Sequence, residues 1–268
     1  MSLLRVEGLG KRFGGLVAID DLSFEVAPGT VHAIIGPNGA GKTTLLNLLS
    51  GIYTPDRGRI VLDGRDVTGQ PSHRFAAAGL GRTFQNLQVF FNMTALENVM
   101  TGRHRHENLA LLPALLRLEP AVWAERRCRA DAEALLRQVG LASWIDARAD
   151  AMPYGALKRL EIARALATEP RLLLLDEPAA GLNHTEAREI DTLIRELAAA
   201  GMTVLLVEHN MRLVMEVSDR VLVLDHGARL AEGTPDEVAR DERVIEAYLG
   251  AELENDARGA TDSEAAHA

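Results

Sequence analysis

The chain has 268 residues, of which 47% are hydrophobic and 25% are charged, and its formal net charge is -9. A chain of this size and composition can bury a full core, so we expect one large domain or a domain with an inserted lobe. Its apolar runs have the length of strands, far short of the roughly 20 residues that span a bilayer, and its negative charge argues against nucleic acid as a partner.

The first 64 residues contain four short β-rich runs bounded by Gly or Pro, at residues 3–9, 22–29, 31–36 and 59–64. Apolar and polar residues alternate over 22–26, which predicts a partly exposed antiparallel sheet. This part of the chain is expected to consist of strands around one helix.

From about residue 94 to 140 the pattern is helical, with Pro113 interrupting the run at 109–118. We therefore expect a helical subdomain inserted at about residues 90–160. Helices and strands then alternate, which predicts a mostly parallel sheet covered by helices. The predicted elements are a helix within residues 152–166, a strand within 171–178, a helix from about 186 to 199, a strand within 203–210, a short helix and a hairpin over 220–233.

Two features close the chain. Thr234 is followed by Pro235 and, three residues on, by Glu237, which predicts a helix that begins with a capping box. Residues 251–268 contain five acidic residues, one basic residue and almost no large apolar side chain, so we expect a disordered acidic tail after a single domain at 1–250. The N-terminal residues lack the apolar segment of a signal peptide, and the single Cys128 cannot form an internal disulfide, which favours a reducing cytoplasm.

The strongest chemical signal is GPNGAGKTT at residues 36–44, which fits G-x-x-x-x-G-K-[ST] between a predicted strand and a predicted helix. Its glycines allow backbone N–H groups to surround an anion, and the helix N-terminus adds positive potential. The sequence therefore predicts a P-loop nucleoside triphosphatase. The predicted ATP-binding residues of this loop are Gly36, Pro37, Asn38, Gly39, Ala40, Gly41, Lys42, Thr43 and Thr44, with Lys42 on the β- and γ-phosphates and Thr43 on Mg²⁺.

A second signal is RLLLLDEP at residues 171–178, an apolar strand that ends in two acids. In a P-loop protein, a carboxylate at a strand end can hold Mg²⁺ and a second one can orient or deprotonate the attacking water. We assign these roles to Asp176 and Glu177.

Two further polar residues stand at expected strand or lobe boundaries. His209 follows the apolar strand 203–207, so it can hydrogen-bond the γ-phosphate at the carboxyl end of the sheet. Gln85 stands between the β-rich part and the helical lobe, where its amide can contact Mg²⁺ or the attacking water.

These motifs in this order resemble the nucleotide-binding subunits of ABC transporters, over about residues 3–250. The resemblance implies a RecA-like P-loop core with an N-terminal antiparallel β subdomain and an inserted α-helical subdomain. It also implies that Phe13 stacks on adenine, that residues 36–44 are Walker A and 172–177 Walker B, and that Gln85 and His209 are the Q-loop and switch residues. RFGGLVAIDDLSFEV, GRTFQNLQVF, DEPAAGLN and EAYLG are similar, more narrowly, to the ATPases of branched-chain amino acid importers (the LivG type).

In ABC ATPases, two subunits close head to tail, and the signature helix of one points at the ATP held by the other. The resemblance assigns this role to Pro153, Tyr154, Gly155 and Ala156. Ala156 departs from the Gln usual in the subfamily, and His184 departs from its usual Pro. Because Ala lacks an amide that reaches the partner's nucleotide, the ATP site completed by this signature is expected to be weakened.

The resemblance implies an ATP- and Mg²⁺-dependent engine of an importer for branched-chain or related amino acids. Its expected partners are a second ABC ATPase, identical or paralogous, integral membrane permease subunits and, indirectly, a solute-binding protein. Its expected location is the cytoplasmic face of the inner membrane. The alternatives are an importer of urea or short amides, a soluble ABC ATPase that acts as a clamp, and a P-loop kinase, which would not explain Gln85, the signature region and His209 together.

Overall fold

The computed structural model describes residues 2–103 and 119–248, and within these ranges no helix is long and apolar enough to cross a membrane. The chain divides into two compact units: the first comprises Met1–Ala78 and Thr203–Ala268, and the second comprises Gly79–Met202. The interrupted run at 109–118 with its Pro113, and the acidic segment 251–268, lie outside the described residues.

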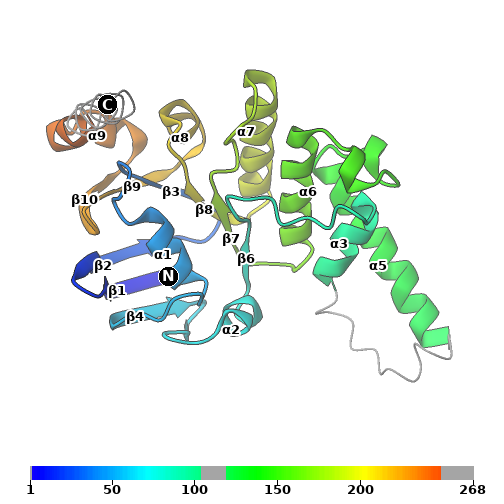
Figure 1. Cartoon of the computed structure of the whole chain (residues 1–268), viewed down its shortest axis with the longest axis horizontal. Coiled ribbons are helices and arrows are strands. Elements are labelled where there is room, and N and C mark those ends of the chain that lie inside the picture. The colour runs from blue at the N-terminus through cyan, green and yellow to red at the C-terminus, as the bar shows by residue number, and fades with distance from the viewer. Residues whose placement is uncertain (1, 104–118, 249–268) are drawn as a thin grey trace, which may run out of the picture. The chain divides into compact units, whose positions relative to one another are not determined.

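The first unit contains an antiparallel sheet with strand order β2-β1-β4-β5, formed by β1 (Leu4–Phe13), β2 (Leu16–Val26), β4 (Arg57–Leu62) and β5 (Arg65–Asp66) (Figure 1). Along the end of β2, Leu22, Phe24 and Val26 are buried whereas Ser23 and Glu25 are exposed. The alternation therefore predicted this sheet correctly, including its half-exposed character.

The same unit contains strand β3 (Val31–Ile35), which runs parallel to both β8 (Thr203–Val207) and β9 (Arg220–Asp225). β9 continues into β10 (Ala228–Gly233) as the predicted antiparallel hairpin. All residues of β3 and β8 are buried, which explains why these strands are apolar apart from His32 and Thr203.

The helices of this unit are α1 (Lys42–Leu49), α2 (Ser72–Ala77), α8 (Met211–Val217) and α9 (Pro235–Ala239). The predicted capping box of α9 is present, with Thr234 as the N-cap and Glu237 as its partner. α2 was not predicted, because six residues carry too little periodicity to signal a helix.

The second unit contains two parallel strands, β6 (Leu80–Arg82) and β7 (Leu172–Asp176), and the helices α3 (Ala95–Arg103), α5 (Glu119–Gln138), α6 (Tyr154–Leu166) and α7 (His184–Ala199). Short 3₁₀ turns occur at Ala142–Trp144 and Ala149–Ala151. α3 packs against α5 and α6, as the expected helical lobe requires (Figure 1). β6 escaped prediction because its three residues include a Gly and an Arg. α7 begins two residues before the predicted start, because Asn183 caps it.

Candidate functional site

The loop between β3 and α1 is shaped by glycines. Gly36, Gly39 and Gly41 have φ values of 152°, 84° and 100°, a region that L-residues rarely adopt. A Cβ on Gly36 would lie 2.2 Å from the carbonyl oxygen of Leu224, and a Cβ on Gly41 would lie 2.6 Å from that of Ala18. The backbone of the loop can therefore take this path only with glycine at these positions.

Lys42 is held against this loop. Its Nζ donates hydrogen bonds to the carbonyl oxygens of Gly36, at 2.6 Å, and Pro37, at 2.9 Å. α1 begins at Lys42 with Gly41 as its N-cap, and no side chain caps it. A strand, a loop of glycines, a lysine and an uncapped helix N-terminus together form an arrangement suited to a phosphate group.

Two more predicted residues of this unit have exposed side chains. His209 follows β8, whose carboxyl end lies at the same sheet edge as that of its parallel neighbour β3. The Nδ1 atom of His209 lies 3.9 Å from Oε2 of the buried Glu208. Phe13 is 43% exposed and packs edge-on against Tyr53, with ring centroids 5.3 Å apart. A partly exposed aromatic ring of this kind can stack on a planar group.

In the second unit, Asp176 ends β7 as predicted, and its carboxylate is buried. Its Oδ2 atom pairs with Nη2 of Arg82 at 3.2 Å, and both side chains are only 7% exposed. Burial raises the pKa of Asp176, and the charge and hydrogen bond of Arg82 oppose that rise. Because an unpaired buried carboxylate would be strongly disfavoured, Arg82 stabilises the charged form of Asp176.

Glu177 and Gln85, which are 92 positions apart, meet in this unit. The Nε2 atom of Gln85 donates a hydrogen bond to Oε2 of Glu177 at 3.1 Å. Glu177 has a φ of 47°, which is uncommon for a residue with a side chain and costs conformational energy. The structure thus brings together the two residues to which the sequence assigned handling of the attacking water.

The predicted signature residues lie at the start of α6. Pro153 is the N-cap, it provides no side-chain hydrogen bond, and the first turn contains no acidic residue. Pro153 and Tyr154 are exposed, whereas Gly155 and Ala156 are buried. A Cβ on Gly155 would lie 2.6 Å from Oε1 of Glu186, so glycine permits the close approach of α6 and α7.

Three charged residues near Asp176 and Gln85 were not predicted from the sequence: Arg82, Lys158 and Glu161. Lys158 and Glu161 are 2% and 3% exposed, although charged side chains are seldom buried. Their sequence signal is weak, because their spacing of three residues occurs in a helix that also contains the charged residues Arg159 and Arg164. Such spacing places them on one face of α6, but it cannot identify their partners.

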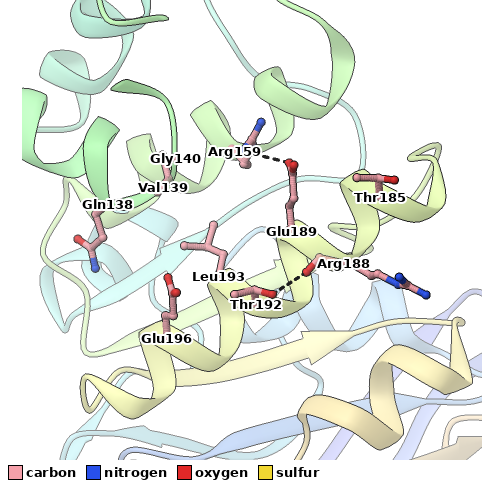
Figure 2. Close-up of a pocket in the computed structure, with 10 residues that line it drawn as sticks. All are labelled: Gln138, Val139, Gly140, Arg159, Thr185, Arg188, Glu189, Thr192, Leu193 and Glu196. Atoms are coloured by element: carbon pink, nitrogen blue, oxygen red, sulfur yellow. Dashed lines mark hydrogen bonds and ion pairs between the residues drawn. The ribbon is translucent and has the colours of Figure 1, made fainter. Parts of the chain in front are cut away.

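A groove of about 340 Å³ lies beside α7, near the end of α5, and is shown in Figure 2. Its wall includes an ion pair between Arg159 Nη1 and Glu189 Oε2 at 3.1 Å, and Val139 and Leu193 supply apolar surface. None of the residues predicted to bind ATP or to act in catalysis lines this groove. We therefore do not assign the nucleotide to it.

Comparison with known families gives two matches. A family model described as ABC transporter matches residues 19–180, and one described as branched-chain amino acid ATP-binding cassette transporter matches residues 228–254. The first of these covers more than half of the chain.

Individual relatives match over nearly their whole length. The chain is 45% identical to the high-affinity branched-chain amino acid transport ATP-binding protein BraF of Pseudomonas aeruginosa, over 92% of this chain and 98% of BraF. It is 43% identical to the corresponding protein LivG of Salmonella typhimurium, with the same coverage. Among solved structures, an ATP-binding cassette of an ABC transporter in its ADP conformation is 34% identical, with a TM-score of 0.81 and coverage of 93% and 99%.

Proposed function

The chain belongs to the ABC transporter ATP-binding family, and on this premise we propose that it binds and hydrolyses ATP to drive import of branched-chain or related amino acids. The observation that carries this function is the near full-length identity of 43–45% to two transport ATP-binding proteins for branched-chain amino acids. The second family model, over residues 228–254, supports the same cargo class.

For the ATP site itself, we propose the residues that the sequence assigned. The phosphates bind to the loop at residues 36–44 and to Lys42, and adenine stacks on Phe13. The support is the glycine-dependent path of the loop, its uncapped helix and the exposed ring of Phe13. His209 contacts the γ-phosphate from the end of β8, the strand beside β3.

We propose Mg²⁺ as the metal, held by Thr43, Gln85 and Asp176. The support is the oxygen donors of these three residues, which suit a hard cation. Among the described residues, no group of three or more His, Cys, Asp or Glu side chains could hold a metal. Mg²⁺ typically binds through one or two carboxylates together with substrate phosphates, so a set with the single carboxylate of Asp176 suits the metal.

For hydrolysis, we propose that Glu177 orients or deprotonates the attacking water and that Gln85 holds Glu177 in position. The 3.1 Å hydrogen bond between the two side chains and the uncommon φ of Glu177 support this assignment. Mg²⁺, when bound, neutralises charge on the phosphate oxygens. The charge and hydrogen bond of Arg82 favour the ionised form of the neighbouring Asp176.

The working assembly that we propose contains two ATPases, with Pro153, Tyr154, Gly155 and Ala156 facing the nucleotide of the partner subunit. No side chain caps the start of α6, and the helix's own first turn contains no acidic residue, which supports an anion at this end. The second ATPase is either an identical or a paralogous chain. In either case, Ala156 provides no side-chain amide for that contact.

A transporter ATP-binding subunit works with integral membrane permease subunits and associates peripherally with the membrane through them. We propose the cytoplasmic face of the inner membrane, where ATP is available, and a solute-binding protein as an indirect partner. The loop that contains Gln85 also contains Phe90 and Phe91, which are 46% and 47% exposed. These rings support contact between this loop and a permease helix. We further propose that residues 1–250 form one ABC ATPase domain.

An importer of urea or short amides is not favoured, because both relatives are named for branched-chain amino acids. A soluble clamp ATPase is not favoured for the same reason. The two classes differ in a simple observable, since only a transporter subunit co-purifies with permease subunits.

The test is to purify the tagged protein from gently solubilised native membranes and to identify the subunits that co-elute. These subunits are then reconstituted in vesicles, with ATP and Mg²⁺ supplied on the side that the ATPase faces. We expect permease subunits to co-elute and radiolabelled leucine to be taken up with ATP hydrolysis. Replacing Lys42 with Ala should abolish both ATP binding and uptake. Uptake of urea but not leucine would overturn the cargo, and co-elution of soluble partners alone would overturn the transporter function.

A further inference from the structure

The loop that contains Gln85 is held by hydrogen bonds and a cation–π contact from one face of α6. Lys158 Nζ donates a hydrogen bond to the backbone carbonyl of Gln85 at 3.2 Å. One turn further along the helix, Oε1 of Glu161 accepts a hydrogen bond from the backbone N–H of Phe84 at 3.1 Å. After three more residues, the guanidinium carbon of Arg164 lies 5.4 Å from the ring centroid of Phe90. The spacing of three residues places all these side chains on one side of α6.

Burial makes these contacts strong. Lys158 and Glu161 are almost fully buried, and hydrogen bonds to charged groups are stronger than those between neutral groups. Burial raises the pKa of Glu161, while the backbone N–H groups of Phe84 and Gln88 and the charge of Lys158 act in the opposite direction. A buried carboxylate surrounded by loop amides holds that loop in a single conformation.

The far end of the loop is fixed as well. Asn98 is fully buried, its Oδ1 accepts from the N–H of Phe90 at 2.8 Å, and its Nδ2 donates to the carbonyl of Phe90 at 3.0 Å. The segment from Phe84 to Phe90 is therefore attached at both ends. Between these attachments, the Gln85 side chain reaches Glu177.

We infer that the polar face of α6 formed by Lys158, Glu161 and Arg164, here called the α6 brace, positions the Gln85 amide against Glu177. These three residues are positioning residues, since they touch the loop and not the reacting atoms. The inference rests on the proposed function, because it assigns Gln85 and Glu177 to ATP hydrolysis.

The main test replaces Glu161 with Gln, which keeps the shape of the side chain but removes its charge and turns an NH₂ group toward the loop amides. We expect kcat for ATP to fall roughly tenfold to a hundredfold, as for the loss of a buried charged hydrogen bond. ATP affinity should stay within about twofold, because the phosphate loop belongs to the other unit. Arg159→Gln is the matched control, since Arg159 lies on the same helix and pairs with Glu189 instead of the loop.

A double-mutant cycle separates positioning from a merely structural role. If Glu161 acts through Gln85, the variant E161Q/Q85A should have the same kcat as Q85A alone. Effects that multiply would overturn the inference, as would wild-type kcat in a folded E161Q variant.

Hydrogen exchange gives a readout that does not depend on activity. Exchange in a peptide that covers residues 84–91 should rise in E161Q, and in Lys158→Met if E161Q fails to fold, but not in R159Q. Unchanged exchange in both variants would overturn the brace. If the wild-type protein binds ATP but hydrolyses none, the proposed function fails instead, and the exchange measurement still tests the brace.

Discussion

A buried histidine in the phosphate-loop strand should make the protein sensitive to mild acid. His32 lies in the middle of β3 and is 1% exposed, with its ring centroid 6.0 Å from that of Phe24. Within the described residues, its Nε2 has no hydrogen-bond partner. Burial lowers the pKa of His32 from 6.5 to about 4, with Arg220 lowering it further and Glu232 partly opposing both.

This shift fixes the sign and size of the effect. Between pH 6.5 and about 4, the unfolded chain binds a proton at His32 that the folded chain does not bind. The free energy of unfolding therefore decreases as the pH falls through this window. The full shift corresponds to about 3 kcal/mol, and at pH 5 the loss relative to pH 7 is about 2 kcal/mol. For a chain of this size, that loss lowers the melting temperature by roughly 4–8 °C.

The perturbation is His32→Leu, which has a similar volume and no proton to bind. Urea unfolding at pH 7 and pH 5, followed by circular dichroism, should show a loss of unfolding free energy in the wild type that exceeds the loss in the variant by about 2 kcal/mol. His73→Gln, on the exposed surface of α2, controls for a general effect of removing a histidine and should behave as the wild type. Equal losses in the wild type and in His32→Leu would refute the reasoning.

Three further changes test the site and its supports. Gly36→Ala should weaken ATP binding at least about tenfold, because its Cβ would lie 2.2 Å from a backbone oxygen, whereas Gly15→Ala, with nothing within 4 Å, should bind ATP normally in a fluorescent-nucleotide titration. Glu177→Gln should retain ATP but release phosphate at least about a hundredfold more slowly, and turnover near the wild-type rate would rule out its role. Asn183→Ala should cost about 1 kcal/mol in thermal unfolding, because the N–H groups of Thr185 and Glu186 lose their shared acceptor, and Asn183→Asp should restore it.

The fold was largely predictable because its signals are local. Apolar alternation in β2, mainly apolar runs in β3, β7 and β8, and the capping box before α9 each depend on neighbouring residues. The short elements α2, β5 and β6 were not predicted, because two to six residues are too few to show a hydrophobic periodicity. The expected domain boundaries and the role of each site residue remain predictions.

The sequence by itself determined the phosphate loop, since its glycines, its lysine and the helix after it are consecutive. The loop needs a positive φ at each of these glycines, and glycine is the residue that adopts a positive φ most readily. It also identified Gln85, Asp176 and Glu177 as candidate residues for binding Mg²⁺ or handling the attacking water. Only the tertiary structure decided which side chains meet: Gln85 with Glu177, Arg82 with Asp176, and Glu161 with the amide of Phe84. These partners are 77 to 94 positions apart, and buried charges are neutralised by whichever group the packing brings close, which local pattern cannot specify.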